Sequence, residues 1–168
     1  MIDFRSDTVT KPTQAMRLAM SNAEVGDDVY GDDPTVNSLQ DMAAEMFGFD
    51  GALFVSSGTQ ANLLALMSHC ERGDEYLCGQ QAHNYKFEGG GAAVLGSIQP
   101  QPLNNQADGS ILLQDIEAAI KPDDVHFAQT RLLSLENTIG GKILSQDYLA
   151  QAQSLAFNRG LKIHLDGA

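Results

Sequence analysis

Short apolar runs alternate with amphipathic segments along most of this chain. Runs with the length and composition of strands occur at residues 53–55, 76–78, 131–135 and 161–166. The segments between them carry apolar residues at helical spacing and predict helices at residues 58–70, 112–120 and 145–158. This alternation predicts an α/β fold with a mostly parallel sheet flanked by helices, in which the mainly apolar segment 161–166 is a central buried strand.

Two further helices are predicted near the N-terminus, each opened by a proline, Pro12 and Pro34. Proline suits the first helical position because its missing N–H would have no partner there. Each segment places apolar side chains on one face, and these are Met16, Ala19 and Met20 in the first and Val36, Leu39, Ala43 and Met46 in the second.

Composition narrows the class of protein. The chain has 168 residues, 43% of them hydrophobic and 19% charged, which suits a folded globular domain rather than a disordered chain. The formal net charge of −12 makes nucleic acid an unsuitable partner, because phosphate contacts require dense lysine and arginine. No apolar run approaches the roughly 20 residues of a membrane helix, and the N-terminus has no signal-peptide core, so we expect a cytoplasmic protein.

Two cysteines, Cys70 and Cys78, lie in apolar surroundings. They have neither CxxC spacing nor histidine-rich neighbours, so they are predicted to be buried free thiols rather than a disulfide or a metal pair. We therefore expect no metal site.

Ser57, Gly58 and Thr59 follow a predicted strand and open a predicted helix. Backbone N–H groups at a helix N-terminus attract phosphate, and small side chains permit its close approach. Serine before a helix is also an ordinary N-cap, so the pattern leaves both readings open.

Asp166 ends a strand that is otherwise mainly apolar. A carboxylate is costly in such a place unless it has a fixed partner, and a protonated pyridine nitrogen would be a suitable one. The alternative is a turn or cap aspartate before Gly167.

Histidines are the remaining candidates for chemistry. His83 follows the second predicted strand and is expected at the same sheet edge as Ser57 and Asp166, where its ring would stack on an aromatic ligand or remain solvated. His69 and His164 are expected to be structural, and the position of His126 before a strand leaves its role open. The chain stops at Ala168, two residues after the last predicted strand, which is expected to interrupt a site at the carboxyl ends of the strands.

Five ordered motifs carry a resemblance that runs through essentially the whole chain: RSDTVT at 5–10, VGDDVYGDDPTV at 25–36, SGTQAN at 57–62, AHNY at 82–85 and HLDGA at 164–168. Together they closely resemble the low-specificity L-threonine aldolase family. The resemblance implies the fold type I large domain of pyridoxal 5'-phosphate (PLP) enzymes, usually in a homotetramer built from two dimers. It also implies retro-aldol cleavage of L-threonine and L-allo-threonine to glycine and acetaldehyde.

The resemblance further implies individual roles. Ser57, Gly58 and Thr59 would hold the cofactor phosphate, His83 would stack on the pyridine ring, and Asp166 would pair with the ring nitrogen. Ser6 would bind the substrate carboxylate, Tyr30 and Glu88 would be active-site neighbours that contact the substrate, and His126 would act near the substrate hydroxyl.

Residues 1–168 then correspond to an N-terminal segment and the first part of the PLP-binding large domain. The rest of that domain, the C-terminal small domain, the Schiff-base lysine and an arginine expected after the DGA motif would lie beyond residue 168. The lysines of this chain match none of that context, so the chain alone is expected to be inactive: Lys11, Lys86, Lys121, Lys142 and Lys162.

The sequence leaves some alternatives open. Relatives often carry His-Asn where this chain has Ile139-Gly140, so the role of that pair is undetermined. One alternative to a threonine aldolase is another fold type I enzyme, a lyase or an aminotransferase relative. A further alternative is a non-catalytic fragment or binding half that acts only with other subunits.

Overall fold

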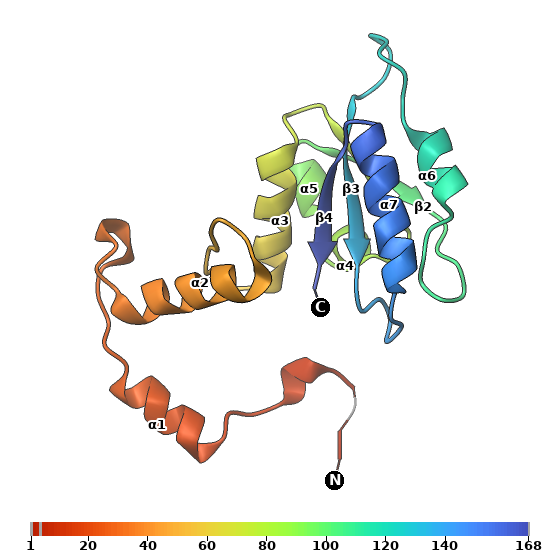
Figure 1. The fold of residues 1–168 in the computed structure, drawn as a ribbon. Coiled ribbons are helices and arrows are strands. Elements are labelled where there is room, and N and C mark those ends of the chain that lie inside the picture. Colours follow the sequence, from red (N-terminus) through yellow and green to blue (C-terminus); the bar gives the residue numbers. More distant parts are fainter. Residues whose placement is uncertain (1, 4, 168) are drawn as a thin grey trace. The chain divides into compact units, whose positions relative to one another are not determined.

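The computed structural model describes residues 2, 3 and 5–167, which form two units (Figure 1). The first unit ends at Phe54 and the second begins at Val55. The first contains helices only, with the bounds η1 Asp7–Val9, α1 Gln14–Asn22, η2 Asp28–Tyr30 and α2 Pro34–Phe47.

The two helices predicted in the first unit are confirmed, although their starts differ. Pro34 is the first residue of α2, and the Asp33 side chain caps it by accepting from backbone N–H groups of the first turn. Pro12, in contrast, lies before the cap of α1, because the Thr13 side chain accepts from the backbone N–H of Met16. The prediction of proline in the first helical position is therefore right for Pro34 and wrong for Pro12.

The second unit is an α/β layer structure in which every strand of the sheet is parallel to its neighbours. Among the described residues the sheet has four strands, in the order β2-β1-β3-β4. Along the chain the elements are α3 Gly58–His69, β1 Glu75–Gly79, α4 His83–Lys86, α5 Gly91–Val94, β2 Gln99–Leu103, α6 Leu113–Ala119, β3 Thr130–Glu136, α7 Gln146–Asn158 and β4 Lys162–Asp166. The predicted parallel sheet flanked by helices is confirmed.

One strand assignment from sequence was wrong, and one strand was missed. Residues 53–55 form no strand, and the backbone N–H of Phe54 instead donates to the Gln40 side chain at 2.9 Å. Residues of β2 were not predicted as a strand because Pro100 and Pro102 interrupt the pattern. Proline is tolerated there because β2 is an edge strand, so a missing N–H costs no ladder hydrogen bond.

The expected central position of segment 161–166 stays a prediction. Within the described residues β4 pairs with β3 along one edge, and Leu165 is 47% exposed. The apolar residues reflect the helices beside this strand, since both α3 and α7 contact β4. An apolar strand indicates that both faces of the sheet are covered there, and it does not show whether the strand is paired along both of its edges.

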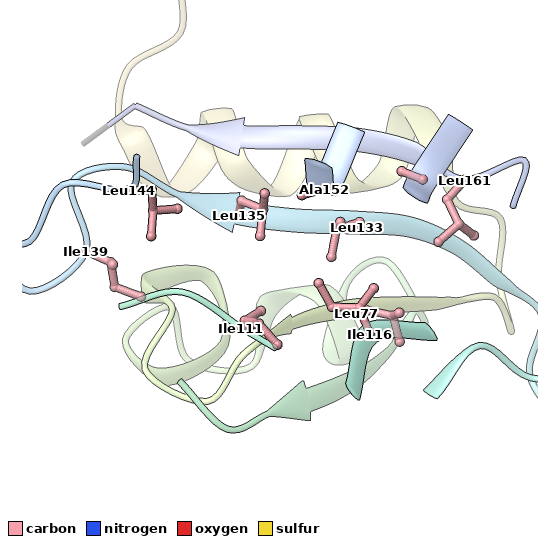
Figure 2. Close-up of a cluster of buried hydrophobic side chains, with 10 residues drawn as sticks. Leu77, Ile111, Ile116, Leu133, Leu135, Ile139, Leu144, Ala152 and Leu161 are labelled. Atoms are coloured by element: carbon pink, nitrogen blue, oxygen red, sulfur yellow. The ribbon is translucent and has the colours of Figure 1, made fainter. Parts of the chain in front are cut away.

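Alternate residues of the central strands pack on opposite faces of the sheet. Leu77, Leu133 and Leu135 belong to a cluster with residues of α6 and α7, shown in Figure 2. Tyr76 and Leu132 belong to a second cluster with residues of α3 and α5. Figure 1 accordingly shows β3 and β4 between α3 and α7.

Cys70 and Cys78 are buried and free, as predicted. Burial raises the pKa of the Cys78 thiol to about 12, which makes it an inert part of the core rather than a nucleophile.

Among the described residues, no helix combines the length and apolar character needed to span a membrane. The same residues contain no group of histidine, cysteine and carboxylate side chains arranged to hold a metal ion.

Candidate active site at the carboxyl edge of the sheet

The start of α3 is a helix N-terminus with free donors. The Ser57 hydroxyl accepts from the backbone N–H of Gln60 at 3.1 Å, and the Gln60 side chain in turn accepts from the backbone N–H and the hydroxyl of Ser56. Ser57 is therefore an N-cap, as the structural alternative predicted. The N–H groups of Gly58 and Thr59 have no intrahelical partner in this geometry, and these exposed residues form the positive end of the helix.

Two carboxylates end neighbouring strands at the same edge of the sheet. Glu136 ends β3 and Asp166 ends β4, and the two are register partners, so their side chains share a face. Figure 1 shows the start of α3 at the end of the sheet to which the arrowheads of β3 and β4 point. Burial raises the pKa of the Glu136 carboxyl, and the nearby charge of Asp166 raises it further.

Asn62, on α3, connects this edge to the helix. Its residue exposure is 5%, and its amide nitrogen donates to Asp166 Oδ2 and to Glu88 Oε1, both at 2.8 Å. Its carbonyl oxygen accepts from His164 Nε2, also at 2.8 Å. A single buried side chain therefore joins the end of β4 to the segment after α4.

His83 is held at two points. Its backbone N–H donates to Glu136 Oε2 at 2.7 Å, which anchors the start of α4, a helix without a side-chain cap of its own. Its ring Nδ1 donates to Glu88 Oε1 at 2.8 Å. The Glu88 side chain is 5% exposed whereas the His83 side chain is 49% exposed, so the ring keeps an accessible face. Phe87 lies beside it, with ring centroids 5.5 Å apart.

His164 faces this network from β4. Burial lowers the pKa of its imidazole, which favours the neutral ring, and the hydrogen bond to the Asn62 carbonyl oxygen requires the proton on Nε2. The expected structural role agrees with this position, and its partner identifies the role as the orientation of Asn62.

The charges at this edge are unbalanced. Glu88, Glu136 and Asp166 bring three carboxylates together, and within the part of the chain that the structure describes no lysine or arginine forms an ion pair with any of them. Such a site favours a ligand that carries positive charge next to these carboxylates.

The structure brings together His83, Glu88 and Asp166 but not His126. His126 lies in the loop before β3, at the amino end of that strand, and its ring pairs with Asp124 at 2.6 Å. Its side chain is 82% exposed. The sequence already indicated this separation, because a residue that precedes a strand lies at its amino end, opposite the carboxyl ends where Glu136 and Asp166 lie.

Ser6 and Tyr30 belong to the first unit, and their substrate roles stay predictions. The Ser6 hydroxyl caps η1 by accepting from the backbone N–H of Thr8. Tyr30 ends η2 and is 78% exposed.

Two residues of the network, Asn62 and Glu136, were missed from sequence. Asparagine is a poor helix former, so Asn62 directly before the apolar run of residues 63–67 was a signal for a buried polar role. Glu136 ends an apolar strand just as Asp166 does, so the argument applied to Asp166 would have found it as well.

The Ile139-Gly140 pair lies in a tight turn. Ile139 is 5% exposed and packs in the core cluster of Figure 2, and it forms an antiparallel bridge with Lys142. Gly140 has φ +55°, a left-handed conformation that suits glycine. The Ile139 side chain therefore belongs to the core of the second unit.

Fold and site together define an open parallel α/β domain whose polar groups converge at the carboxyl ends of the strands, where such sheets bind ligands. The β-eliminating lyase family model matches residues 3–168. The chain belongs to this family.

Curated relatives agree with this membership. The low specificity L-threonine aldolase of Escherichia coli (strain K12) is 63% identical over 168 residues, which are 100% of this chain and 50% of that protein. The probable low-specificity L-threonine aldolase 2 of Arabidopsis thaliana is 46% identical over 173 residues, covering 99% and 49% of the two chains. This chain spans about half the length of these relatives.

Solved structures share the fold. The threonine aldolase of Leishmania major superimposes with a TM-score of 0.76 at 24% identity, over 92% of this chain and 45% of that one. A putative L-allo-threonine aldolase from Listeria monocytogenes gives a TM-score of 0.70 at 24% identity, over 90% and 42% of the two chains.

Proposed function

We propose that the full-length protein containing this chain is a PLP-dependent aldehyde-lyase that cleaves L-threonine and L-allo-threonine to glycine and acetaldehyde. The observation that carries the proposal is the carboxylate excess of Glu88, Glu136 and Asp166 beside a helix N-terminus with free N–H groups. The threonine aldolases of Escherichia coli and Arabidopsis thaliana support the choice of substrate.

The residues present fit PLP by their chemistry. The cofactor has an anionic phosphate and a ring nitrogen that binds a proton, and the site offers N–H donors at Gly58 and Thr59 and a carboxylate at Asp166. The half-exposed ring of His83 would stack on the pyridine ring. When bound, the cofactor supplies an electron sink for the pair released when the Cα–Cβ bond of the substrate breaks.

The protein residues then have distinct tasks. Asp166 would hold the proton on the ring nitrogen, and Asn62 would orient its carboxylate by donating a hydrogen bond to Oδ2. The Ser57 side chain caps α3 by accepting from the N–H of Gln60, and this would leave the N–H groups of Gly58 and Thr59 available to the phosphate. His83 would restrict the ring to one plane and exclude water from that face.

Three further residues complete the proposal on the substrate side. We assign Ser6 to the substrate carboxylate, and Tyr30 and Glu88 to the surroundings of the substrate. The resemblance to threonine aldolases is the basis for these assignments.

The experiment is an amino-acid panel assayed with full-length protein and PLP. Release of acetaldehyde and glycine from L-threonine or L-allo-threonine is the expected result. The family description favours β-elimination as the second candidate, which would instead release ammonia and a 2-oxo acid from amino acids with a leaving group at the β-carbon. Elimination without aldol cleavage, or no turnover of any amino acid, would overturn the proposal.

We further propose that the full-length protein is a homotetramer. Large apolar side chains are exposed on the helices of the first unit, among them Met16, Met20, Met42 and Met46. Contiguous exposed apolar residues commonly mark subunit contacts. A monomer in sedimentation equilibrium at micromolar concentration would overturn this assembly.

A further inference from the structure

We propose that Asn62 is the positioning residue of the cofactor site, which orients Asp166 directly and His83 through Glu88. The inference rests on the proposed function and deepens it, because it names the group that aligns two cofactor contacts from different segments. Asp166 lies 104 residues from Asn62 in the sequence, and Glu88 lies 26 residues from it.

The hydrogen-bonding capacity of the Asn62 amide matches its surroundings. The nitrogen has two protons, and each points to a carboxylate, one on Asp166 and one on Glu88. The oxygen accepts from His164 Nε2. Rotating the amide by 180° would set its oxygen against two carboxylates, so only one orientation is stable and His164 fixes it.

This arrangement determines which oxygen of Asp166 faces a ligand. Oδ2 is engaged by Asn62 at 2.8 Å, and among the described residues no hydrogen bond reaches Oδ1. Asn62 therefore holds the carboxylate in one rotamer and leaves Oδ1 for a protonated ring nitrogen.

The same side chain acts on His83 through one intermediate. Glu88 Oε1 accepts from both Asn62 Nδ2 and His83 Nδ1, each at 2.8 Å. Since the Glu88 side chain is 5% exposed, water competes little for this oxygen. Movement of Asn62 would thus shift the orientation of the His83 ring.

Asparagine is the residue type that this position requires. Aspartate has nearly the same shape but lacks both donors and would add a third charge between Asp166 and Glu88. Alanine removes the donors without adding charge. The pair Asn62→Ala and Asn62→Asp therefore separates hydrogen bonding from the filling of space.

The test measures PLP dissociation constants of full-length apoprotein by titration at pH 8. We expect Asn62→Ala to raise the constant about tenfold to a hundredfold, the effect of losing a hydrogen bond to a charged group. Asn62→Asp should raise it further. If Asn62 only filled space, the near-isosteric aspartate would bind PLP better than the alanine variant, and that order would overturn the proposal.

Thr130→Val is the matched control for lost stability. Thr130 is 8% exposed at the amino end of β3, and its hydroxyl donates to Glu75 Oε1 at 3.0 Å. This variant should lower the unfolding temperature and leave the PLP dissociation constant unchanged. If Thr130→Val raised the PLP dissociation constant as much as Asn62→Ala does, the effect of Asn62→Ala would be explained by lost stability alone. That result would overturn the proposal.

A second measurement does not depend on the cofactor. In ¹⁵N NMR spectra of the apoprotein, Asn62→Ala should shift the ring signals of both His164 and His83, and leave those of His126 unchanged. Glu88→Gln should shift His83 with a smaller effect on His164, and it serves if the Asn62 variants fail to fold. An unshifted His83 signal in Asn62→Ala would overturn the proposal, whereas a wild-type protein that fails to bind PLP would overturn only the proposed function.

Discussion

Two polar networks lie at opposite ends of the same parallel sheet and differ in their balance of charge. At the amino end, Glu75 is fully buried, with its carboxylate 3.1 Å from the Lys121 ammonium and 3.0 Å from the Thr130 hydroxyl. The Gln99 amide donates to its other oxygen at 2.8 Å. This carboxylate has a cation and neutral donors within the protein.

The carboxyl end has the opposite balance. Three carboxylates, on Glu88, Glu136 and Asp166, share the donors of Asn62 and His83, and no described lysine or arginine pairs with them. A buried charge without a counterion costs stability. The difference teaches that the carboxylate of the amino-end network is neutralised by a lysine of this chain, whereas among the described residues the carboxyl-end carboxylates are held by neutral donors and a histidine.

The largest effect is expected when a substitution removes the proposed ligand contact of the carboxyl-end network. In the full-length protein, Asp166→Ala should reduce aldolase turnover by on the order of 10²–10³-fold, because it removes the charge that holds the ring proton. His83→Ala should weaken PLP retention and reduce turnover less. Steady-state acetaldehyde release measures both, and wild-type turnover in the Asp166 variant would refute its assignment.

A substitution in the amino-end network should lower the stability of the protein and leave its activity unchanged. Glu75→Gln leaves the partly buried Lys121 without its counterion and should lower the free energy of unfolding by about 3 kcal/mol. Turnover per folded molecule should be unchanged. Urea unfolding together with the activity assay tests this contrast, which fails if Glu75→Gln impairs turnover while stability is retained.

A smaller effect is expected at the start of α3. Ser57→Asp preserves an N-cap but faces the cofactor phosphate with a negative charge, so the PLP dissociation constant should rise roughly tenfold, about 1.4 kcal/mol. The matched control is Ser145→Asp, since the Ser145 hydroxyl caps α7 by accepting from the backbone N–H of Tyr148 in the same way. Equal PLP affinity in the two variants would mean that the phosphate lies elsewhere.

The smallest effect concerns pH. Burial lowers the pKa of His164 in the folded state, so the unfolded chain binds its proton first as the pH falls below about 6.5. Because of His164, the free energy of unfolding should therefore fall as the pH is lowered from 7 to 5.5. Above pH 7 this residue should not change it. In His164→Gln, which keeps a donor for Asn62, the loss of stability over this range should be smaller. Thermal unfolding at both pH values measures the difference, and equal losses in the two proteins would contradict the prediction.

The pattern of the sequence predicted the elements whose residues repeat with a clear period. Helix α7 and strand β3 were both predicted, because apolar spacing reflects burial against the sheet. Asp166 was found for a similar local reason, since a carboxylate at the end of an apolar run requires a partner. Strand β2 and the order of the strands were not found, because strand order depends on pairing between distant segments.

By itself, then, the sequence determined the parallel α/β class and named the candidates Ser57, His83 and Asp166. Only the tertiary structure decided that Asn62 joins Asp166 to Glu88, and through Glu88 to His83. The physical reason is the range of the forces involved. Periodicity and capping act within a few residues, whereas the Asn62 hydrogen bond to Asp166 spans 104 positions and exists only once the sheet and α3 have packed.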